Sequence, residues 1–249
     1  MRREDEPQSS VTQGSSSHLL AYHVGAGGIN MATDDVLLEC GPTPLLRFYG
    51  WSEPTLSLGH FQGLRGPPFV LPEKPQSVVR RMTGGGAILH DQELTYSVIL
   101  EETHPLLHGL ETQASYAVLH EPIIRALRLL GIDAAPGTAP SAGGESTFYC
   151  FERITPMDLR VGNLKLVGSA QRRKAGRVLQ HGSILLASSP VPAGATTVER
   201  EVRRGIPPQV LAELITQEFR PLFSPLLPYA VPAEIRDRIL NRVPDFVVR

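Results

Sequence analysis

Three consecutive glycines stand between two apolar segments in the stretch VVRRMTGGGAILHDQELTYSVIL, residues 78–100. Glycine readily adopts positive φ angles, and without a Cβ its backbone can lie directly against a ligand. Successive N–H groups in such a loop can bind a phosphate or an oxyanion. Arg80 and Arg81 precede the glycines at the end of a predicted strand, where neighbouring side chains point to opposite faces. One of the two is therefore expected to face the ligand and the other to anchor the loop.

The spacing around these glycines differs from the common nucleotide-binding motifs. No Gly-Lys-Ser/Thr follows them, and the pattern G-x-G-x-x-G is absent from the stretch. The residues alone leave a second interpretation open, in which a glycine-rich surface turn joins two strands and His90 and Asp91 form a local cap.

Two cysteines, one lysine and two histidines are the other candidate groups. Cys150 ends the aromatic segment STFYC, and a lone cysteine in such a setting is more often a buried small hydrophobe than a nucleophile. Cys40 lies on the apolar face of a predicted helix and is expected in the core. Lys165 by itself indicates an exposed hairpin lysine, and His60 and His181 are as consistent with hydrogen-bonded strand ends as with function. No spacing of His, Cys, Asp or Glu indicates a zinc or calcium site.

Strands are predicted on both sides of these residues. SVVRR and LTYSVIL flank the glycines, and LLRFYGW and TLSLGHF precede them. In MDLRVGNLKLVGSAQ the pair Gly162-Asn163 is a strong signal for a tight hairpin, which would carry Lys165. Residues 174–176 then turn the chain into the strand RVLQHGSILLA.

Apolar residues at helical spacing predict four helices, over residues 30–41, 113–131, 207–219 and 232–243. In the first helix, Asn30 is expected to be the N-cap and Gly41 the C-cap. Pro122 is expected to start a new helix or to kink the second one, and Pro207 and Pro208 are expected to open the third.

The length and the order of the elements predict one domain. At 249 residues the chain suits a single large domain. Strands, hairpins and terminal helices in this order favour an α+β fold over residues 21–249, with a mixed, largely antiparallel sheet flanked by helices. Residues 1–20 are polar, lack the apolar core of a signal peptide and are expected to be a disordered tail. Residues 134–146, rich in Gly, Pro and Ser, are expected to be a loop.

Composition argues against several classes of function. The formal net charge of −1 gives no general basic field for holding nucleic acid. No apolar run approaches the roughly 18 residues that a membrane helix needs, so no membrane partner is expected. Two cysteines are too few for a disulfide framework, which favours a reducing, cytoplasmic compartment.

The stretch RRMTGGGAILHDQELTYSV resembles the signature RR-x-[ST]-GG-x-x-x-x-HD of the lipoate/biotin protein ligase and octanoyltransferase family. Further matching segments occur in order along the chain, namely NMATDDVLLE, WSEPTLSLGHFQ, LKLVGSAQRR and LQHGSILL. Together they span about residues 30–186. The resemblance implies a mixed-sheet catalytic domain that binds a medium-length acyl group in a hydrophobic tunnel. It also implies transfer of that group to one lysine of a small lipoyl domain or of the glycine-cleavage H protein.

The same resemblance implies a set of site residues. The acyl and pantetheine end of the pocket would be formed by Arg80, Thr83, Gly84, Gly85, Gly86 and His90. Lys165 matches the lysine that family members use near the acyl carbonyl. Backbone N–H groups near Gly168 and Ser169 are expected to stabilise an oxyanion.

The way in which the acyl group is activated differs within the family, and the presence of Cys150 is the feature that distinguishes the transferases from the ligases. Ligases use ATP and form an acyl-adenylate, octanoyltransferases take the chain from acyl carrier protein onto a cysteine, and a third group takes it from the H protein, also through a cysteine. STFYCFERITPMDLRV resembles the cysteine segment of the monomer-type octanoyltransferases of Gram-positive bacteria, in which the cysteine precedes the lysine. Cys150 is therefore predicted to be the nucleophile, with Lys165 favouring its thiolate. No cofactor is expected, because a thioester donor is already activated.

Alternatives to this assignment stay open. Gly86 stands where these octanoyltransferases usually carry arginine, and the resulting motif more closely resembles that of the ATP-dependent ligases. A ligase would need ATP and magnesium. The H protein is an alternative donor. A non-catalytic acyl-binding protein derived from the family would share the fold, although the joint presence of Cys150, Lys165 and the glycines speaks against it. Biotin ligase fits less well, because its GRGRxG motif is absent. The acyl chain length and the oligomeric state are left open.

Overall fold

A mixed eight-stranded sheet is the centre of the structure, a computed structural model that describes residues 16–63, 75–138, 148–187 and 194–248. Its strand order is β11-β1-β2-β6-β10-β9-β8-β7. β1 runs parallel to β2 and β11, and the other neighbouring pairs are antiparallel, which confirms the predicted α+β class. The strands are β1 (Ser17–Gly25), β2 (Leu45–Trp51), β6 (Glu93–Glu101), β7 (Ala135–Pro136), β8 (Leu159–Val161), β9 (Leu164–Lys174), β10 (Arg177–Leu185) and β11 (Leu226–Pro228).

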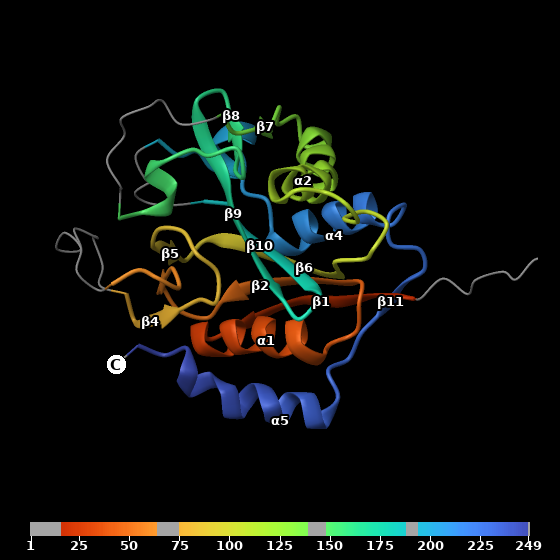
Figure 1. Cartoon of the computed structure of the whole chain (residues 1–249). Coiled ribbons are helices and arrows are strands. Elements are labelled where there is room, and N and C mark those ends of the chain that lie inside the picture. Colours follow the sequence, from red (N-terminus) through yellow and green to blue (C-terminus); the bar gives the residue numbers. More distant parts are fainter. Residues whose placement is uncertain (1–15, 64–74, 139–147, 188–193, 249) are drawn as a thin grey trace, which may run out of the picture.

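A second, three-stranded sheet carries the glycine segment (Figure 1). Its strands, in spatial order, are β4 (Ser77–Arg80), β3 (Thr55–Leu58) and β5 (Ile88–His90). Because β3 is parallel to β4 and antiparallel to β5, the chain between β4 and β5 must cross the C-terminal end of β3. Two backbone hydrogen bonds fix that crossing, from Arg81 N to Leu58 O at 3.0 Å and from His60 N to Thr83 O at 2.8 Å.

Helices cover both faces of the large sheet (Figure 1). α1 and α5 lie on one face, and α2 and α4 lie on the other. No helix within the described ranges is long and apolar enough to cross a membrane. The helices are α1 (Gly27–Cys40), α2 (Thr112–Leu129), α3 (Val198–Val202), α4 (Pro208–Phe219) and α5 (Ala233–Arg242), with 3₁₀ turns η1 (Cys150–Glu152) and η2 (Val243–Asp245).

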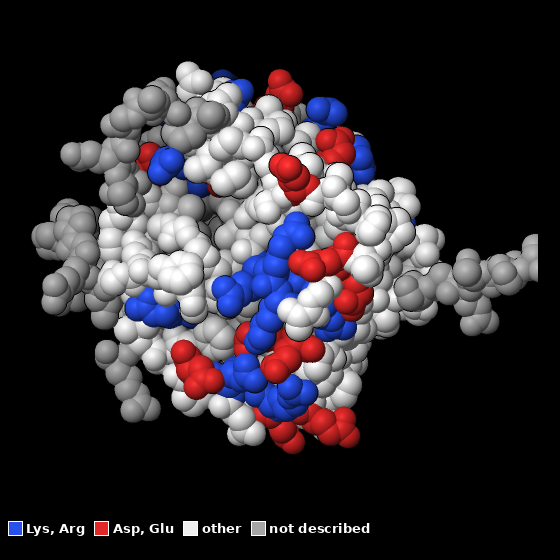
Figure 2. Space-filling view, in the orientation of Figure 1, with Lys and Arg blue, Asp and Glu red and all other residues white. Residues whose placement is uncertain are grey.

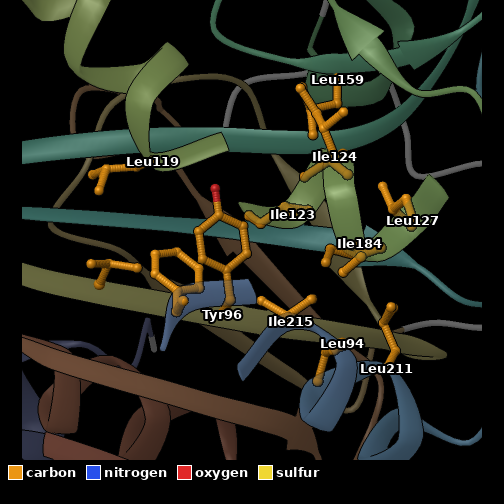
Figure 3. Packing of buried hydrophobic residues seen from close by; sticks show 14 of the residues in the cluster. Leu94, Tyr96, Leu119, Ile123, Ile124, Leu127, Leu159, Ile184, Leu211 and Ile215 are labelled. Atoms are coloured by element: carbon orange, nitrogen blue, oxygen red, sulfur yellow. The ribbon is translucent and has the colours of Figure 1, made fainter. Parts of the chain in front are cut away.

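Two hydrophobic cores, one on each face of the sheet, hold these layers together. Figure 3 shows one of them, in which Leu94 and Ile184 of the sheet meet Ile123 of α2 and Ile215 of α4. The other core lies beneath α1 and α5 and includes Leu37. Full burial of a single side chain of this size contributes about 1.5–3 kcal/mol. The strands β2, β6 and β10, which are buried almost throughout, therefore form a firm base for whatever lies at their ends.

Charged side chains of both signs lie next to one another on one face of the molecule (Figure 2). Figure 2 shows Lys and Arg interspersed with Asp and Glu around the turn between β9 and β10 and over α5. Arg177 lies 2.9 Å from Glu101, and Arg242 lies 3.0 Å from Glu39. Such exposed pairs add little stability, about 0–1 kcal/mol each, and they leave no large field of one sign on this face.

The predicted helices are present, but the expected start of α1 is wrong. The helix begins earlier, with Ala26 as its N-cap. Asn30 is used elsewhere, because its Nδ2 donates to Gly25 O at 3.1 Å and to Gly50 O at 3.0 Å, which ties the helix start to β1 and β2. Gly41 as the C-cap is confirmed.

The prediction that Pro122 starts a new helix is wrong. It lies inside the continuous helix α2, in the face that is buried together with Leu119 and Ile123. A proline in this position removes one helical hydrogen bond, and we attribute the persistence of the helix to the packing of this face on the sheet.

Short strands account for most of what the sequence did not predict. Residues 17–20, assigned to the disordered tail, form the first part of β1, because β11 and β2 pair with it on both sides. The rest of that predicted tail, residues 1–15, lies outside the described residues. The predicted loop over 134–146 contains β7 and continues beyond the described part of the chain. Both predicted hairpin turns are confirmed, with positive φ at Gly162 and at residues 175–176.

A chain of buried polar side chains lies between α2 and the sheet. Ser169 Oγ lies 2.8 Å from Tyr96 Oη and 2.9 Å from His120 Nε2. Gln180 Nε2 donates to Tyr96 Oη at 2.9 Å. Burial lowers the pKa of His120 to about 3, so this imidazole is neutral at neutral pH.

We expect His120→Gln to weaken the acid sensitivity of the fold. The unfolded state binds a proton at this histidine below about pH 6.5, whereas the folded state excludes it down to about pH 3. The contribution of this histidine to the free energy of unfolding is therefore complete above about pH 6.5 and decreases as the pH falls from there toward about pH 3. The decrease between about pH 7 and pH 5 is about 2 kcal/mol. Urea unfolding at the two pH values measures this loss, which should shrink by that amount in the variant. The exposed His108→Gln is the control; a loss as large in His120→Gln as in the wild type contradicts the prediction.

Candidate active site

A cavity of about 480 Å³ lies between the small sheet, the η1 turn and β9. Its volume is in the range of small-molecule sites. Its wall brings together most of the residues that the sequence singled out. These are Cys150, Lys165, Gly84, Gly85, Gly86, His90, Gly168, Ser169 and, from the residues left open, His181.

Cys150 is held in the cavity wall by backbone pairing with the glycine segment. Tyr149 forms a parallel bridge with Ala87. Ala87 N donates to Phe148 O at 2.8 Å, and Cys150 N donates to Ala87 O at 2.9 Å. The Cys150 side chain is half-buried, so its thiol can meet a ligand. Cys40, by contrast, packs at the edge of the core beneath α1, as expected.

Glycine is required at two of the three positions, and for different reasons. A Cβ on Gly86 would lie 2.9 Å from both Cys150 N and Phe148 O, so only glycine lets the two segments pair this closely. Gly85 has a φ of +98°, which other residues rarely adopt. A Cβ on Gly84 would meet nothing within 4 Å, so neither packing nor backbone conformation requires glycine there.

Lys165 approaches the Cys150 thiol from the start of β9. Its Nζ lies 3.4 Å from Cys150 Sγ, and it donates to Cys150 O at 2.9 Å and to Arg153 O at 3.2 Å. The Asp158 carboxylate lies 3.0 Å from the same nitrogen. Only 1% of Lys165 is exposed, and a buried ammonium needs such partners. The interpretation of Lys165 as an exposed hairpin lysine is therefore wrong.

Gly168 makes room for that lysine. A Cβ at this position would lie 3.1 Å from Lys165 Cε and 3.4 Å from both Lys165 Nζ and Phe151 Cζ. The Phe151 ring itself packs beside the ammonium, with 5.1 Å between Nζ and the ring centroid. Glycine at 168 thus preserves the approach of Lys165 to the thiol.

Ser169 presents a backbone donor at the free edge of β9. Residues 175–176 form a two-residue turn with positive φ, which makes Lys174 and Arg177 a hydrogen-bonded pair. Alternation along β9 then directs the Ser169 N–H away from β10. β8 pairs with that edge only as far as Val167, so in the described structure no strand covers the Ser169 N–H.

The two arginines before the glycines occupy different places. Arg81 lines the cavity, and its guanidinium donates to Gly84 O and Gly86 O, both at 2.8 Å. Arg80 is not among the lining residues, and its Nη1 donates to Gly59 O at 3.1 Å. The structure therefore places Arg81, and not the predicted Arg80, at the cavity, while both arginines help to hold the loop.

Thr83 lies behind the cavity wall in a buried polar chain. Its Oγ1 lies 2.8 Å from His181 Nε2, and His181 Nδ1 lies 3.2 Å from Asp34 Oδ2. Asp34 also pairs with Arg47 and accepts a hydrogen bond from Tyr49. Although burial alone would raise it, Arg47 and His181 hold the pKa of Asp34 below its ordinary value, so this carboxylate is charged. His181 thus lines the cavity with both ring nitrogens occupied.

His90 faces the cavity with one ring nitrogen unoccupied. Its ring stacks on Trp51, with the centroids 3.8 Å apart, and its Nδ1 lies 2.8 Å from Glu93 Oε1. Burial lowers the pKa of His90, although the Glu93 carboxylate opposes this, so the ring is neutral at neutral pH. Nδ1 therefore donates to Glu93, and the lone pair is on Nε2. Nε2 is buried and has no partner in the described structure, so it can accept a hydrogen bond from a ligand.

Several residues around the cavity were not singled out from the sequence. Asp158 is the clearest case, although the spacing from Thr155 to Asp158 is that of a capping box. Its proximity to Lys165 depends on the hairpin between them, which composition does not report. Trp51 and Glu93, which hold His90, carry no local signal either. Within the described ranges no group of three His, Cys, Asp or Glu side chains could hold a metal ion.

Comparison with known families supplies an independent assignment. The lipoyl protein ligase A/B catalytic domain matches residues 27–206. The chain belongs to this family. Its relatives include Octanoyltransferase LipM of Moorella thermoacetica (44% identical over 165 residues), of Kyrpidia tusciae (42% over 185) and of Bacillus subtilis (44% over 169). The matched regions cover 63%, 69% and 63% of this chain but only 60%, 66% and 60% of those proteins.

Solved structures share the fold of this lipoyl protein ligase domain. Protein Ta0514 from T. acidophilum with bound lipoic acid has a TM-score of 0.76 at 20% identity, over 93% of this chain and 95% of that one. Lipoate-protein ligase A bound with ATP has a TM-score of 0.70 at 20% identity, over 92% and 94%. At these identities the likeness establishes the fold, as the sequence resemblance implied.

We expect Gly86→Ala to destabilise the domain and displace Cys150, because the new Cβ would meet the backbone of the cysteine segment. Overpacking of this kind costs about 1–3 kcal/mol. Urea unfolding measures the loss, and the rate of Cys150 alkylation by iodoacetamide reports the displacement. Gly84→Ala is the matched control, since open space surrounds that position. Equal behaviour of the two variants would refute the role given to Gly86.

Proposed function

We propose that this chain is an octanoyltransferase of lipoate biosynthesis. It would move an octanoyl group from acyl carrier protein, through a thioester on Cys150, to the acceptor lysine of a lipoyl domain or of the glycine-cleavage H protein. The observation that carries the proposal is the 3.4 Å contact between Cys150 Sγ and the buried Lys165 Nζ in the cavity wall. The 42–44% identity to relatives named octanoyltransferase LipM supports it. The compartment that it implies is the cytoplasm.

In the first half-reaction the Cys150 thiolate attacks the carbonyl carbon of the donor thioester. The Sγ–C bond forms, the bond to the carrier sulfur breaks, and that sulfur leaves as a thiolate and takes up a proton. The adjacent Lys165 ammonium favours the attacking thiolate. Because the donor is already a thioester, this route needs neither ATP nor a metal ion.

In the second half-reaction the neutral ε-amine of the acceptor lysine attacks the acyl-Cys150. The N–C bond forms, the C–Sγ bond breaks, and a proton passes from the amine nitrogen to the sulfur. Lys165 Nζ and the uncovered Ser169 N–H lie on the β9 side of the cavity, where they can stabilise the oxygen of the tetrahedral intermediate.

The remaining wall of the cavity suits the acyl chain and the pantetheine arm. Glycine backbone at 84–86 allows a close approach. His90 Nε2 offers an acceptor for an amide N–H of the arm. Arg81, which is held by its hydrogen bonds to the glycine loop, contributes a positive charge at the same wall of the cavity.

Gly86 is the residue that pointed toward an ATP-dependent ligase. Its close contact with Cys150 N and Phe148 O gives glycine a local reason that is independent of ATP. The presence of glycine here therefore does not favour the ligase. Cys150 supports the transferase, because a ligase that forms an acyl-adenylate needs no cysteine nucleophile.

We expect Cys150→Ser to abolish octanoyl transfer from octanoyl carrier protein in the absence of ATP, because serine is a far weaker nucleophile toward a thioester. The assay follows the mass of an apo lipoyl domain. Cys40→Ser is the matched control and should retain activity. An active Cys150→Ser enzyme, or transfer that requires lipoate and ATP, would instead support the ligase.

Lys165→Met should lower the transfer rate about 100-fold or more, since it removes both the cation beside the thiol and a donor to the acyl oxygen. Methionine keeps much of the volume, so urea unfolding should still be cooperative. Single-turnover transfer measures the effect. Full activity of this variant would remove the lysine from the mechanism.

A further inference from the structure

The charges around Lys165 change in the course of the proposed reaction. Cys150 Sγ and the Asp158 carboxylate lie 3.4 Å and 3.0 Å from its Nζ. Other ionisable side chains that line the cavity include Arg81 from the glycine segment, Tyr116 from α2 and Arg153 after η1. With Cys150 as a thiolate, the ammonium has two anionic neighbours. With Cys150 acylated, the sulfur carries no charge, and Asp158 is the one anion left in direct contact among the described residues.

Asp158 is fixed for this contact before any ligand arrives. It is 2% exposed, and its Oδ2 accepts from Thr155 N at 2.8 Å and from Thr155 Oγ1 at 2.9 Å. Its own backbone N–H donates back to Thr155 O at 3.0 Å, and its carbonyl accepts from Gly137 N at 2.8 Å. Lys165 is also fixed by its backbone, because Lys165 N donates to Gly194 O at 2.8 Å and Thr196 N donates to Lys165 O at 2.9 Å.

Stability alone does not account for the pair. Burying two charges costs several kcal/mol per ion in desolvation, and replacing such a pair by apolar residues of similar volume is often neutral or stabilising. A buried carboxylate beside the residue that contacts the nucleophile therefore calls for a role in the chemistry.

We infer that Asp158 is a positioning residue that keeps Lys165 in its ammonium form while Cys150 carries the acyl group. Lys165 then acts in both half-reactions as a cation and hydrogen-bond donor, and not as the base that removes the proton of the acceptor amine. The inference rests on the proposed function for the acyl state, but the charge state of Lys165 can be measured without it. The proton of the attacking amine passes to the departing sulfur, as in the balanced step above.

The first test measures the charge of Lys165 directly. The chain contains three lysines, Lys74, Lys165 and Lys174, so ¹³C-lysine labelling gives three sets of ε-carbon signals, and Lys165→Met assigns one of them. Alkylation with iodoacetamide gives Cys150 an uncharged thioether in place of the acyl group. Lys165 of alkylated Asp158→Asn should lose its proton at a lower pH than Lys165 of the alkylated wild type, because without the carboxylate burial disfavours its charge.

The matched control is Glu218→Gln, which removes an ion pair of 2.7 Å with Arg125 between α4 and α2, remote from the cavity. Its Lys165 signal should titrate as in the wild type. If Asp158→Asn does not fold, Thr155→Val carries the test, since it removes one hydrogen bond to the carboxylate and should shift the Lys165 titration in the same direction by less. Identical titration of Lys165 in the wild type and the Asp158 variant would overturn the inference.

The second test separates the half-reactions. Asp158→Asn should form the acyl-enzyme within about threefold of the wild-type rate, because the thiolate itself then balances Lys165. Its transfer to the lipoyl domain should be about tenfold or more slower, with a deficit that grows as the pH rises. Equal slowing of both steps, or unchanged transfer, contradicts the inference. A wild-type enzyme that forms no acyl adduct contradicts the proposed function instead, and the lysine titration still decides the role of Asp158.

Discussion

The burial of the Lys165 ammonium is the constraint on which the rest of the site depends. A charge that is 99% removed from solvent must be surrounded by groups that replace water, and here they are two backbone carbonyls, the Asp158 carboxylate and the Cys150 sulfur. Gly168 has no side chain because the lysine occupies that space. The η1 turn follows the same constraint, since it supplies both the thiol and a carbonyl. Electrostatic demand thus determines which backbone segments must meet at this point.

The fold meets that demand by bringing three separate segments to one end of the sheet. β9 supplies the lysine, the crossing between β4 and β5 supplies the glycines, and the residues before η1 pair with that crossing through Ala87. The sheet beneath them is buried on both faces, so the relative placement of the segments rests on well-packed strands. The cavity wall therefore combines backbone from these segments with the polar side chains of His90 and His181.

The sequence was sufficient for those features that depend on neighbouring residues. The turn at Gly162 follows from the positive φ that glycine allows, and the cap at Gly41 follows from its close approach to Leu37 O; both are confirmed. Alternation also showed that Arg80 and Arg81 face opposite ways, but which of them meets the cavity depends on how β4 pairs with β3.

The remaining features depend on partners that are distant in the sequence. Asn30 was predicted to be a helix cap, but its side chain donates to the carbonyl of Gly50, which lies 20 residues later in another strand. The pairing of Asp158 with Lys165 likewise forms only once the hairpin is folded. Cys150 and Lys165 were chosen through resemblance, since their local sequence favoured ordinary structural roles.

The proposed reaction requires that Cys150 carry the acyl group during transfer. The most direct measurement is the intact mass of the wild-type protein after incubation with octanoyl carrier protein without ATP, followed by addition of an apo lipoyl domain. If Cys150 is the acyl carrier, the protein gains one octanoyl adduct per chain, which maps to Cys150, is released by hydroxylamine as a thioester, and moves to the lipoyl domain upon its addition. An unmodified protein that octanoylates or lipoylates the domain only when free acid and ATP are supplied would contradict it.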